Sequence, residues 1–275
     1  MEVLQVLADA ALDTLKVLPI LMIAYVLVEW AEHVLGQKQA KLLSGKAAPL
    51  FGAAVGLLPQ CGFSVAATDF YSKGRLTTGT LLAVYLSTSD EAVPVLLAHP
   101  DRIGLLLPVL LSKFVFACVV GFCTDLFFPR KVSVAEETPQ EEVPAVQRYL
   151  KEPLLRTLKV GGFLLLVNCA LGLILFAVGE DRLKDFLTAG EALQPLFCAL
   201  VGLIPNCGAS VALMQLYLSG GLRFGACIGG LCVNAGVALG YLFKSNANKK
   251  ENFAILAAQF LLGVAYGYFL LLFPL

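Results

Sequence analysis

The stretch PQCGFSVA at residues 59–66 returns in the second half of the chain as PNCGASVA at residues 205–212. When residues 49–79 are shifted by 146 onto residues 195–225, 17 of the 31 positions are identical. The identical positions include proline, cysteine, serine, tyrosine and glycine, so a shared richness in leucine and valine does not explain the match. Self-similarity at a fixed offset indicates a duplicated architecture.

The duplication extends beyond this motif and divides the chain. The sequence TLKV at residues 14–17 recurs at residues 157–160. We therefore predict two homologous membrane repeats, over residues 1–130 and 151–275. Between them, residues 131–150 are rich in proline and glutamate, which is typical of a solvated linker. We expect this linker on the cytoplasmic side.

The composition is that of a membrane protein. Hydrophobic residues make up 58% of the chain and charged residues 15%, against about 45–50% and about 25% in soluble domains. The mean hydropathy is +0.80, and apolar runs of about 20 residues, long enough to cross a bilayer as helices, recur along the chain. The net charge of zero argues against a nucleic-acid partner. The eight cysteines lie in apolar segments, where they act as small hydrophobic residues or soft ligands.

Four apolar segments are predicted in each half. They cover 14–35, 47–72, 76–98 and 103–128 in the first half, and 160–178, 192–218, 224–243 and 252–273 in the second. Proline and glycine interrupt the second segment of each half, so each of these segments should form two half-helices. The predicted fold is an all-α membrane protein with ten helical elements, in which each repeat has three full spans plus one broken hairpin.

The charges of the loops favour a re-entrant hairpin over a single crossing. If segment 47–72 enters the membrane and turns back, the basic loops at 36–46 and 73–75 lie together on the cytoplasmic side, as expected for basic loops. Length alone allows either geometry. The hairpin gives each half an odd number of crossings, so the repeats would be inverted, as in many transporters. We expect a multi-pass protein of the bacterial cytoplasmic membrane with both termini outside.

The two hairpin tips are the first candidate site. Half-helix N-termini carry unpaired N–H groups and a positive dipole end, which attract anions or oxygen-bearing solutes. Cys61 and Cys207 would face each other, and thiolates select soft ions; the alternative is a tight turn with a small buried thiol. The predicted substrate-binding residues are Gln60, Cys61, Gly62, Ser64, Asn206, Cys207, Gly208 and Ser210 at the tips, with Thr88 and Asn234 in the following segments.

Charged residues within the apolar segments form a second candidate site. Asp90 and Glu91 lie in mid-segment, where a charge costs about 2.5–3.5 kcal/mol on insertion scales, which favours a functional role. Lys113 is the expected partner, and the alternative is a structural ion pair. Lys113 aligns with Gln259 in the second repeat, so the charged residues of this candidate site lie in the first half only. We predict that these four residues compensate charge or couple transport to protons, and that Asp90 and Glu91 are alternative metal ligands.

The half-motif LPxCGxS, its duplication and the run STSDEA at residues 87–92 resemble a bacterial family described as ten-span heavy-metal exporters or arsenic efflux proteins. The resemblance implies a permease that exports a heavy metal or metalloid. The pattern is more distantly similar to the organoarsenical permeases, whose tips carry a second cysteine. Some relatives are described as manganese transporters, and Asp90 and Glu91 would suit that harder ion.

We therefore interpret the chain as a secondary-active permease that binds a small ion or molecule between the tips at 59–64 and 205–210. The alternatives are a Mn²⁺ exporter that uses Asp90 and Glu91, a transporter of a small organic anion, and a passive channel. The sequence has no phosphate loop, zinc-protease motif or nucleophile elbow, so neither an enzyme nor a cofactor is predicted. The expected partners are the lipid bilayer and a coupling proton or other ion, and a homo-oligomer remains open.

Overall fold

A computed structural model describes residues 45, 47–58, 61–88, 92–97, 99–129, 192–205 and 207–272, together with scattered residues between 8 and 26, at 132, and between 150 and 190. The described residues form helices and connecting loops, without a β-strand among them. Most of the predicted first segments, 14–35 and 160–178, and of the linker 131–150 lies outside the described residues.

The two halves have helices with matching bounds. The first half contains α3 (Ala48–Gly56), α4 (Cys61–Ser72), α5 (Thr78–Ser87), α6 (Ala92–Leu97), the short 3₁₀ helix η1 (Pro100–Leu105) and α7 (Leu106–Phe127). The second half contains α10 (Gln194–Gly202), α11 (Cys207–Leu218), α12 (Phe224–Val233), α13 (Val237–Ser245) and α14 (Lys249–Leu271). Adding 146 to the bounds of α3, α4 and α5 gives those of α10, α11 and α12. The duplication seen in the sequence therefore extends to the helices.

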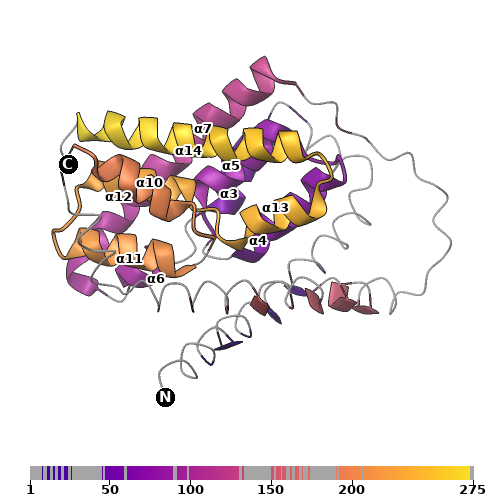
Figure 1. Cartoon of the computed structure of the whole chain (residues 1–275), viewed down its shortest axis with the longest axis horizontal. Helices are drawn as coiled ribbons and strands as arrows, with labels where there is room; N and C mark the ends of the chain where they lie inside the picture. Colours follow the sequence, from indigo (N-terminus) through magenta and orange to yellow (C-terminus); the bar gives the residue numbers. More distant parts are fainter. Residues whose placement is uncertain are drawn as a thin grey trace.

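Four helical stretches of the described chain are long and apolar enough to cross a membrane: Thr78–Leu97, Asp101–Phe127, Phe224–Ser245 and Lys249–Leu271. The first and third are 73% and 83% buried within the protein, whereas the other two are 22% buried. The helices α5 and α12 are therefore central, and α7 and α14 lie at the outside, as Figure 1 shows for α14 along one edge. An apolar outer surface is expected where helices meet lipid, so these helices are consistent with the predicted all-α membrane protein.

Both repeated motifs interrupt a helix, as predicted. Helix α3 ends at Gly56 and α4 begins at Cys61; likewise α10 ends at Gly202 and α11 begins at Cys207. The proline of each motif cannot donate the hydrogen bond that would continue the helix. The predicted re-entrant path of these segments and the inverted topology of the repeats remain predictions.

A second break in each half differs from the sequence interpretation. Segments 76–98 and 224–243 were predicted as full spans, but the structure divides each into two helices, α5 and α6 in the first half and α12 and α13 in the second. The backbone leaves the helical conformation at equivalent residues, Thr88 with ψ of 125° and Asn234 with ψ of 98°. In the second half, Gly236 has φ of +57°, a conformation that favours glycine. The break in the second half therefore has a local contribution that hydrophobicity does not reveal.

Glycine sets the spacing between the central and outer helices in both halves. A Cβ atom added to Gly79 of α5 would lie 2.2 Å from the backbone oxygen of Gly121 in α7. At the equivalent crossing, a Cβ atom on Gly225 of α12 would lie 2.6 Å from the oxygen of Gly267 in α14. Small residues at such crossings let helix backbones approach closely in membranes. The duplicated glycines therefore specify the same helix packing twice.

The short helices pair across the two halves. Helix α4 packs on α13, and α6 packs on α11, so each of these helices has its partner in the other half. Figure 1 shows α4 beside α13 at one end of the molecule and α6 beside α11 at the other. The central helices α5 and α12 also touch each other. The four helix breaks are thus held in one structural unit built from both halves.

Candidate substrate site

The repeated motif places the start of a half-helix in each half. Cys61 is the first residue of α4 and Cys207 the first residue of α11. Gly62 is buried and Gly208 is exposed. Gln60, Asn206 and the side chains of Cys61 and Cys207 lie outside the described residues, so the predicted approach of the two thiols remains a prediction.

The first tip is joined to the break in the central helix. The hydroxyl oxygens of Ser64 in α4 and Thr88 at the end of α5 lie 2.9 Å apart, and both side chains are buried. The Thr88 hydroxyl donates to the Val84 backbone oxygen at 2.7 Å, so Ser64 donates to Thr88. The structure therefore brings together two predicted site residues from different segments. Their counterparts Ser210 and Asn234 are also buried.

Lys113 connects the broken central helices of both halves. Its side chain is fully buried, and its ammonium donates hydrogen bonds to the backbone oxygen of Thr88 and, at 3.0 Å, to that of Leu231 in α12. The C-terminal end of a helix carries a partial negative charge that a cation stabilises. Lys113 therefore provides a positive charge at the ends of α5 and α12. Asp90 and Glu91, its predicted partners, lie outside the described residues.

Gln259 in α14 is the equivalent of Lys113 in α7 by the shift of 146 residues. Like Lys113, it contacts the end of α12. It is fully buried, and its Nε2 donates to the backbone oxygens of Val233 at 2.8 Å and Cys232 at 3.4 Å. Its Oε1 has no hydrogen-bond partner in the described part of the chain. Asn234 follows Val233 in the chain, and its Oδ1 accepts from the Gly236 backbone N–H at 2.7 Å. The second break therefore carries amide groups where the first carries a charged one.

Sequence reasoning missed a further polar group that extends from the first tip. The Thr68 hydroxyl donates to the Ser64 backbone oxygen at 2.7 Å, and it lies 2.6 Å from the hydroxyl of Tyr85. Because the Thr68 proton goes to Ser64, the Tyr85 hydroxyl donates to Thr68, and the Ala238 backbone oxygen of α13 lies 3.4 Å from the same tyrosine hydroxyl. The available signal was spacing, because Thr68 lies one helical turn after Ser64 and therefore on the same face.

At the far end of α4, another polar contact links the two halves. The hydroxyl of Tyr71, which is fully buried, donates to the carboxylate of Glu251 at the start of α14. Asn246 donates to the same carboxylate at 3.4 Å and to Asn252 Oδ1 at 2.7 Å. A fully buried tyrosine needs a hydrogen-bond partner, and here the other half supplies it. This cluster holds α4 against the turn between α13 and α14.

The described residues contain no group of three or more histidine, cysteine, aspartate or glutamate side chains that could hold a metal ion. All four predicted metal ligands, Cys61, Cys207, Asp90 and Glu91, have side chains outside the description. The helix breaks therefore supply a buried polar framework, and the sequence places those four residues directly beside it. Their coordination geometry remains a prediction.

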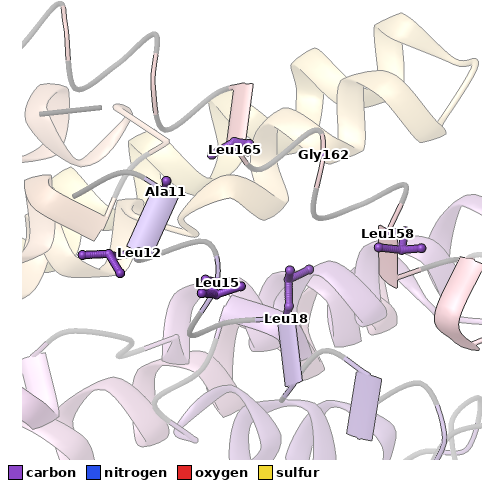
Figure 2. A pocket seen from close by; sticks show the side chains of 7 residues that line it. All are labelled: Ala11, Leu12, Leu15, Leu18, Leu158, Gly162 and Leu165. Carbon is purple, nitrogen blue, oxygen red and sulfur yellow. The ribbon is translucent and has the colours of Figure 1, made fainter. Parts of the chain in front are cut away.

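A separate cavity of about 450 Å³ lies between residues 11–18 of the first half and residues 158–165 of the second, where the predicted first segments begin (Figure 2). Its lining residues are Ala11, Leu12, Leu15, Leu18, Leu158, Gly162 and Leu165. These side chains offer an ion neither a charge nor a hydrogen-bonding group. An apolar space of this kind suits hydrocarbon, so the candidate ion site is at the helix breaks instead.

The fold and the site define a class of protein. Helices that break at membrane depth are tolerated where protein or a watery cavity covers the freed backbone groups, and such breaks form the binding sites of many transporters. The chain belongs to the family described as "Putative, 10TM heavy-metal exporter", whose model matches residues 2–182 and 158–273. This confirms the resemblance stated from the LPxCGxS motif. No match was found among curated proteins, nor among solved structures.

Proposed function

We propose that this protein is a secondary-active exporter of a heavy metal or a metalloid such as an arsenical, which binds between the two motif tips. Lys113 carries the proposal: one buried ammonium contacts the ends of broken helices from both halves. A charge held between two halves responds to their relative movement, as alternating access requires. Membership of the family supports both the direction of transport, which is export, and the class of substrate, which is a heavy metal.

The motif tips supply the proposed ligands. Because α4 and α11 each begin at the motif cysteine, Cys61 and Cys207 stand at half-helix N-termini, where the positive dipole end favours the thiolate. Thiolates bind soft metals and trivalent arsenic in preference to hard cations. The hydrogen bond from Ser64 to Thr88 ties the first tip to the end of α5. Movement of the tip on substrate release would therefore displace the end of α5 through this hydrogen bond.

Coupling is assigned to the acidic pair that follows Thr88. Asp90 and Glu91 come two and three residues after the carbonyl group that Lys113 binds. A carboxylate close to a buried ammonium is stabilised as the anion, and its protonation would weaken that attraction. Protons entering in exchange for the exported ion would thus change the strength with which Lys113 holds the helix ends.

Accumulation in everted membrane vesicles tests this function. Methylarsenite, arsenite and Mn²⁺ would be compared with and without a proton gradient, for the wild type, for Cys61→Ser/Cys207→Ser and for Asp90→Asn. Cys123→Ser is the matched control, because Cys123 lies exposed on α7, away from the helix breaks. We expect gradient-driven accumulation of an arsenical that the control retains and the double variant loses.

Other outcomes would redirect the proposal. Transport of Mn²⁺ alone, sensitive to Asp90→Asn but not to the loss of both thiols, would make the carboxylates the ligands. Movement of a small organic anion that survives both substitutions would assign the site to the half-helix N-termini and Lys113. Flux that never builds a gradient would contradict a secondary-active mechanism and indicate a channel.

A further inference from the structure

Two polar contacts fasten the halves together at one end of the molecule. The hydroxyl of Tyr71 in α4 donates to the Glu251 carboxylate at the start of α14. Two residues earlier in α4, Asp69 accepts from the Tyr241 hydroxyl of α13 at 3.5 Å. These contacts join residues 180 and 172 positions apart in the chain, so both connect the first half to the second.

The interface behind these contacts is closed to solvent. Tyr71 is fully buried, and so are Val65 of α4 and Ala238 and Leu242 of α13, which belong to the same apolar cluster. A solute could therefore pass between α4 and α13 only after the two helices separate. Because Tyr71 lies on α4 and Glu251 follows α13 at the start of α14, that separation would break their hydrogen bond.

The equivalent pair of helices at the other end of the molecule, α6 and α11, is held differently. Shifting Tyr71 by 146 gives Tyr217 of α11, and shifting Glu251 back by 146 gives Leu105. Tyr217 and Leu105 both pack against one apolar cluster. The repeated tyrosine therefore binds a carboxylate at one end and packs among apolar side chains at the other.

A hydrogen bond at the rim of an interface is suited to repeated opening. When it breaks, water takes the place of each partner, so the net cost is a small part of the strength of the bond itself. An apolar contact has no such replacement, because opening exposes its surface to water. The bond between Tyr71 and Glu251 can therefore form and break with little net cost, as a reversible fastening between moving helices requires.

The charges around this end indicate the side of the membrane that it faces. Lys73 and Arg75 follow α4, while Lys244, Lys249 and Lys250 flank the turn between α13 and α14. Basic residues near the ends of spans collect on the cytoplasmic side. We therefore expect this end in the cytoplasm, from which the substrate of an exporter is taken.

We propose that Tyr71 and Glu251 form a latch that closes the cytoplasmic entrance, and that its release lets α4 separate from α13 to admit the substrate; this rests on the proposed transport function. The latch acts on the same helix that carries the first motif tip, because α4 also holds Ser64. Movement of α4 would strain the hydrogen bond between Ser64 and Thr88. Opening of the entrance and rearrangement of the first tip are thereby linked.

Thiol accessibility at the closed interface tests the latch in the full-length protein. Ala238→Cys places a reporter within the buried cluster between α4 and α13. A membrane-impermeant maleimide would be applied to everted vesicles with no exported substrate present, and mass spectrometry would quantify labelling at the reporter peptide separately from the native thiols. We expect Tyr71→Phe to raise the labelling rate about tenfold, as for the loss of one hydrogen bond to a charged group.

Three further measurements show whether the effect belongs to the latch. Glu251→Leu, which copies Leu105 of the other repeat, should also raise labelling, and adding Tyr71→Phe should then have little further effect. Tyr217→Phe is the matched control, because it removes the equivalent hydroxyl at the apolar end, and it should leave labelling unchanged. The native thiol of Cys227, buried in the apolar cluster of that end, should stay unlabelled in every variant.

Equal reporter labelling with and without the Tyr71 hydroxyl would overturn the latch, as would the same rise in the Glu251→Leu background. A parallel rise at Cys227 would indicate general unfolding and overturn it too. Labelling from intact cells but not from everted vesicles would refute a cytoplasmic entrance. Because the readout needs no substrate, an operating latch without metal accumulation would contradict the proposed function alone, and metal accumulation with unchanged labelling would contradict the latch alone.

Discussion

The ammonium of Lys113 donates a hydrogen bond to the backbone oxygen of Leu231, 3.0 Å away and 118 residues further along the chain. This contact joins the outer helix of one half to the central helix of the other. Replacing Lys113 with methionine would leave two carbonyl groups without their donor, at about 1–3 kcal/mol for each buried group. We expect Lys113→Met to abolish gradient-driven transport and to lower the thermal midpoint in nanodiscs.

Lys250→Met is the matched control for this substitution. Lys250 is exposed near the start of α14, so loss of its charge should leave both transport and the midpoint near their wild-type values. If Lys113→Met transports normally, the contact with Leu231 has no part in coupling the halves. Lys113→Gln, which copies the residue of the other repeat, should recover part of the lost stability but not transport.

The close crossing of α5 and α7 predicts a steric effect at Gly79. A side chain there would enter the space occupied by the Gly121 backbone oxygen, which is 2.2 Å from the ideal Cβ position. We expect Gly79→Val to lower the free energy of unfolding by about 1–3 kcal/mol, the cost typical of overpacking. Reversible unfolding in mixed micelles would measure this change in the free energy of unfolding. Gly104→Val is the comparison, because no atom lies within 4 Å of a Cβ there; an equal loss in both variants would refute close packing.

The hydrogen bond between Ser64 and Thr88 predicts a measurable coupling energy. Their hydroxyl oxygens are 2.9 Å apart and buried. Hydrogen bonds between membrane helices average about 0.6 kcal/mol in double-mutant cycles, with a maximum of about 1.7 kcal/mol. The cycle of Ser64→Ala, Thr88→Val and the double variant should give a value in this range. Strict additivity would show that the tip and the break are independent.

The predicted re-entrant hairpin can be tested by topology mapping. Single cysteines would replace Lys41 and Lys73, the basic residues on either side of segment 47–72. The positive-inside rule places both loops in the cytoplasm, so a membrane-impermeant thiol reagent should label both positions in everted vesicles and neither in intact cells. Labelling from opposite sides would show that the segment crosses the membrane once.

The sequence predicted the family, the membrane class and the first pair of helix breaks, and each has a clear physical signal. Apolar length indicates spans, and proline followed by glycine interrupts a helix at any depth. The breaks after Thr88 and Asn234 were not predicted. Their causes are a glycine with positive φ, side-chain hydrogen bonds and a lysine from another helix. None of these is a local property of hydrophobicity.

The candidate site was predicted in part. The sequence singled out Ser64 and Thr88, and the structure shows that they touch. It also singled out Lys113 and Gln259, but could not show that each contacts the end of a central helix. Thr68 and Tyr85 were missed because hydroxyl groups in an apolar segment are common, and a contact between two helices depends on their relative rotation.

The exchange of short helices between the halves has an evolutionary consequence. Helix α4 is covered by α13 and α6 by α11, so a half-length chain would leave one face of each of its own short helices uncovered. A precursor that existed before duplication could bury them only by assembling as two copies of itself. Fusion of those copies then freed equivalent positions to diverge, which accounts for a lysine at 113 and a glutamine at 259. A single gene that encodes both halves can carry such an asymmetry, whereas two identical copies cannot.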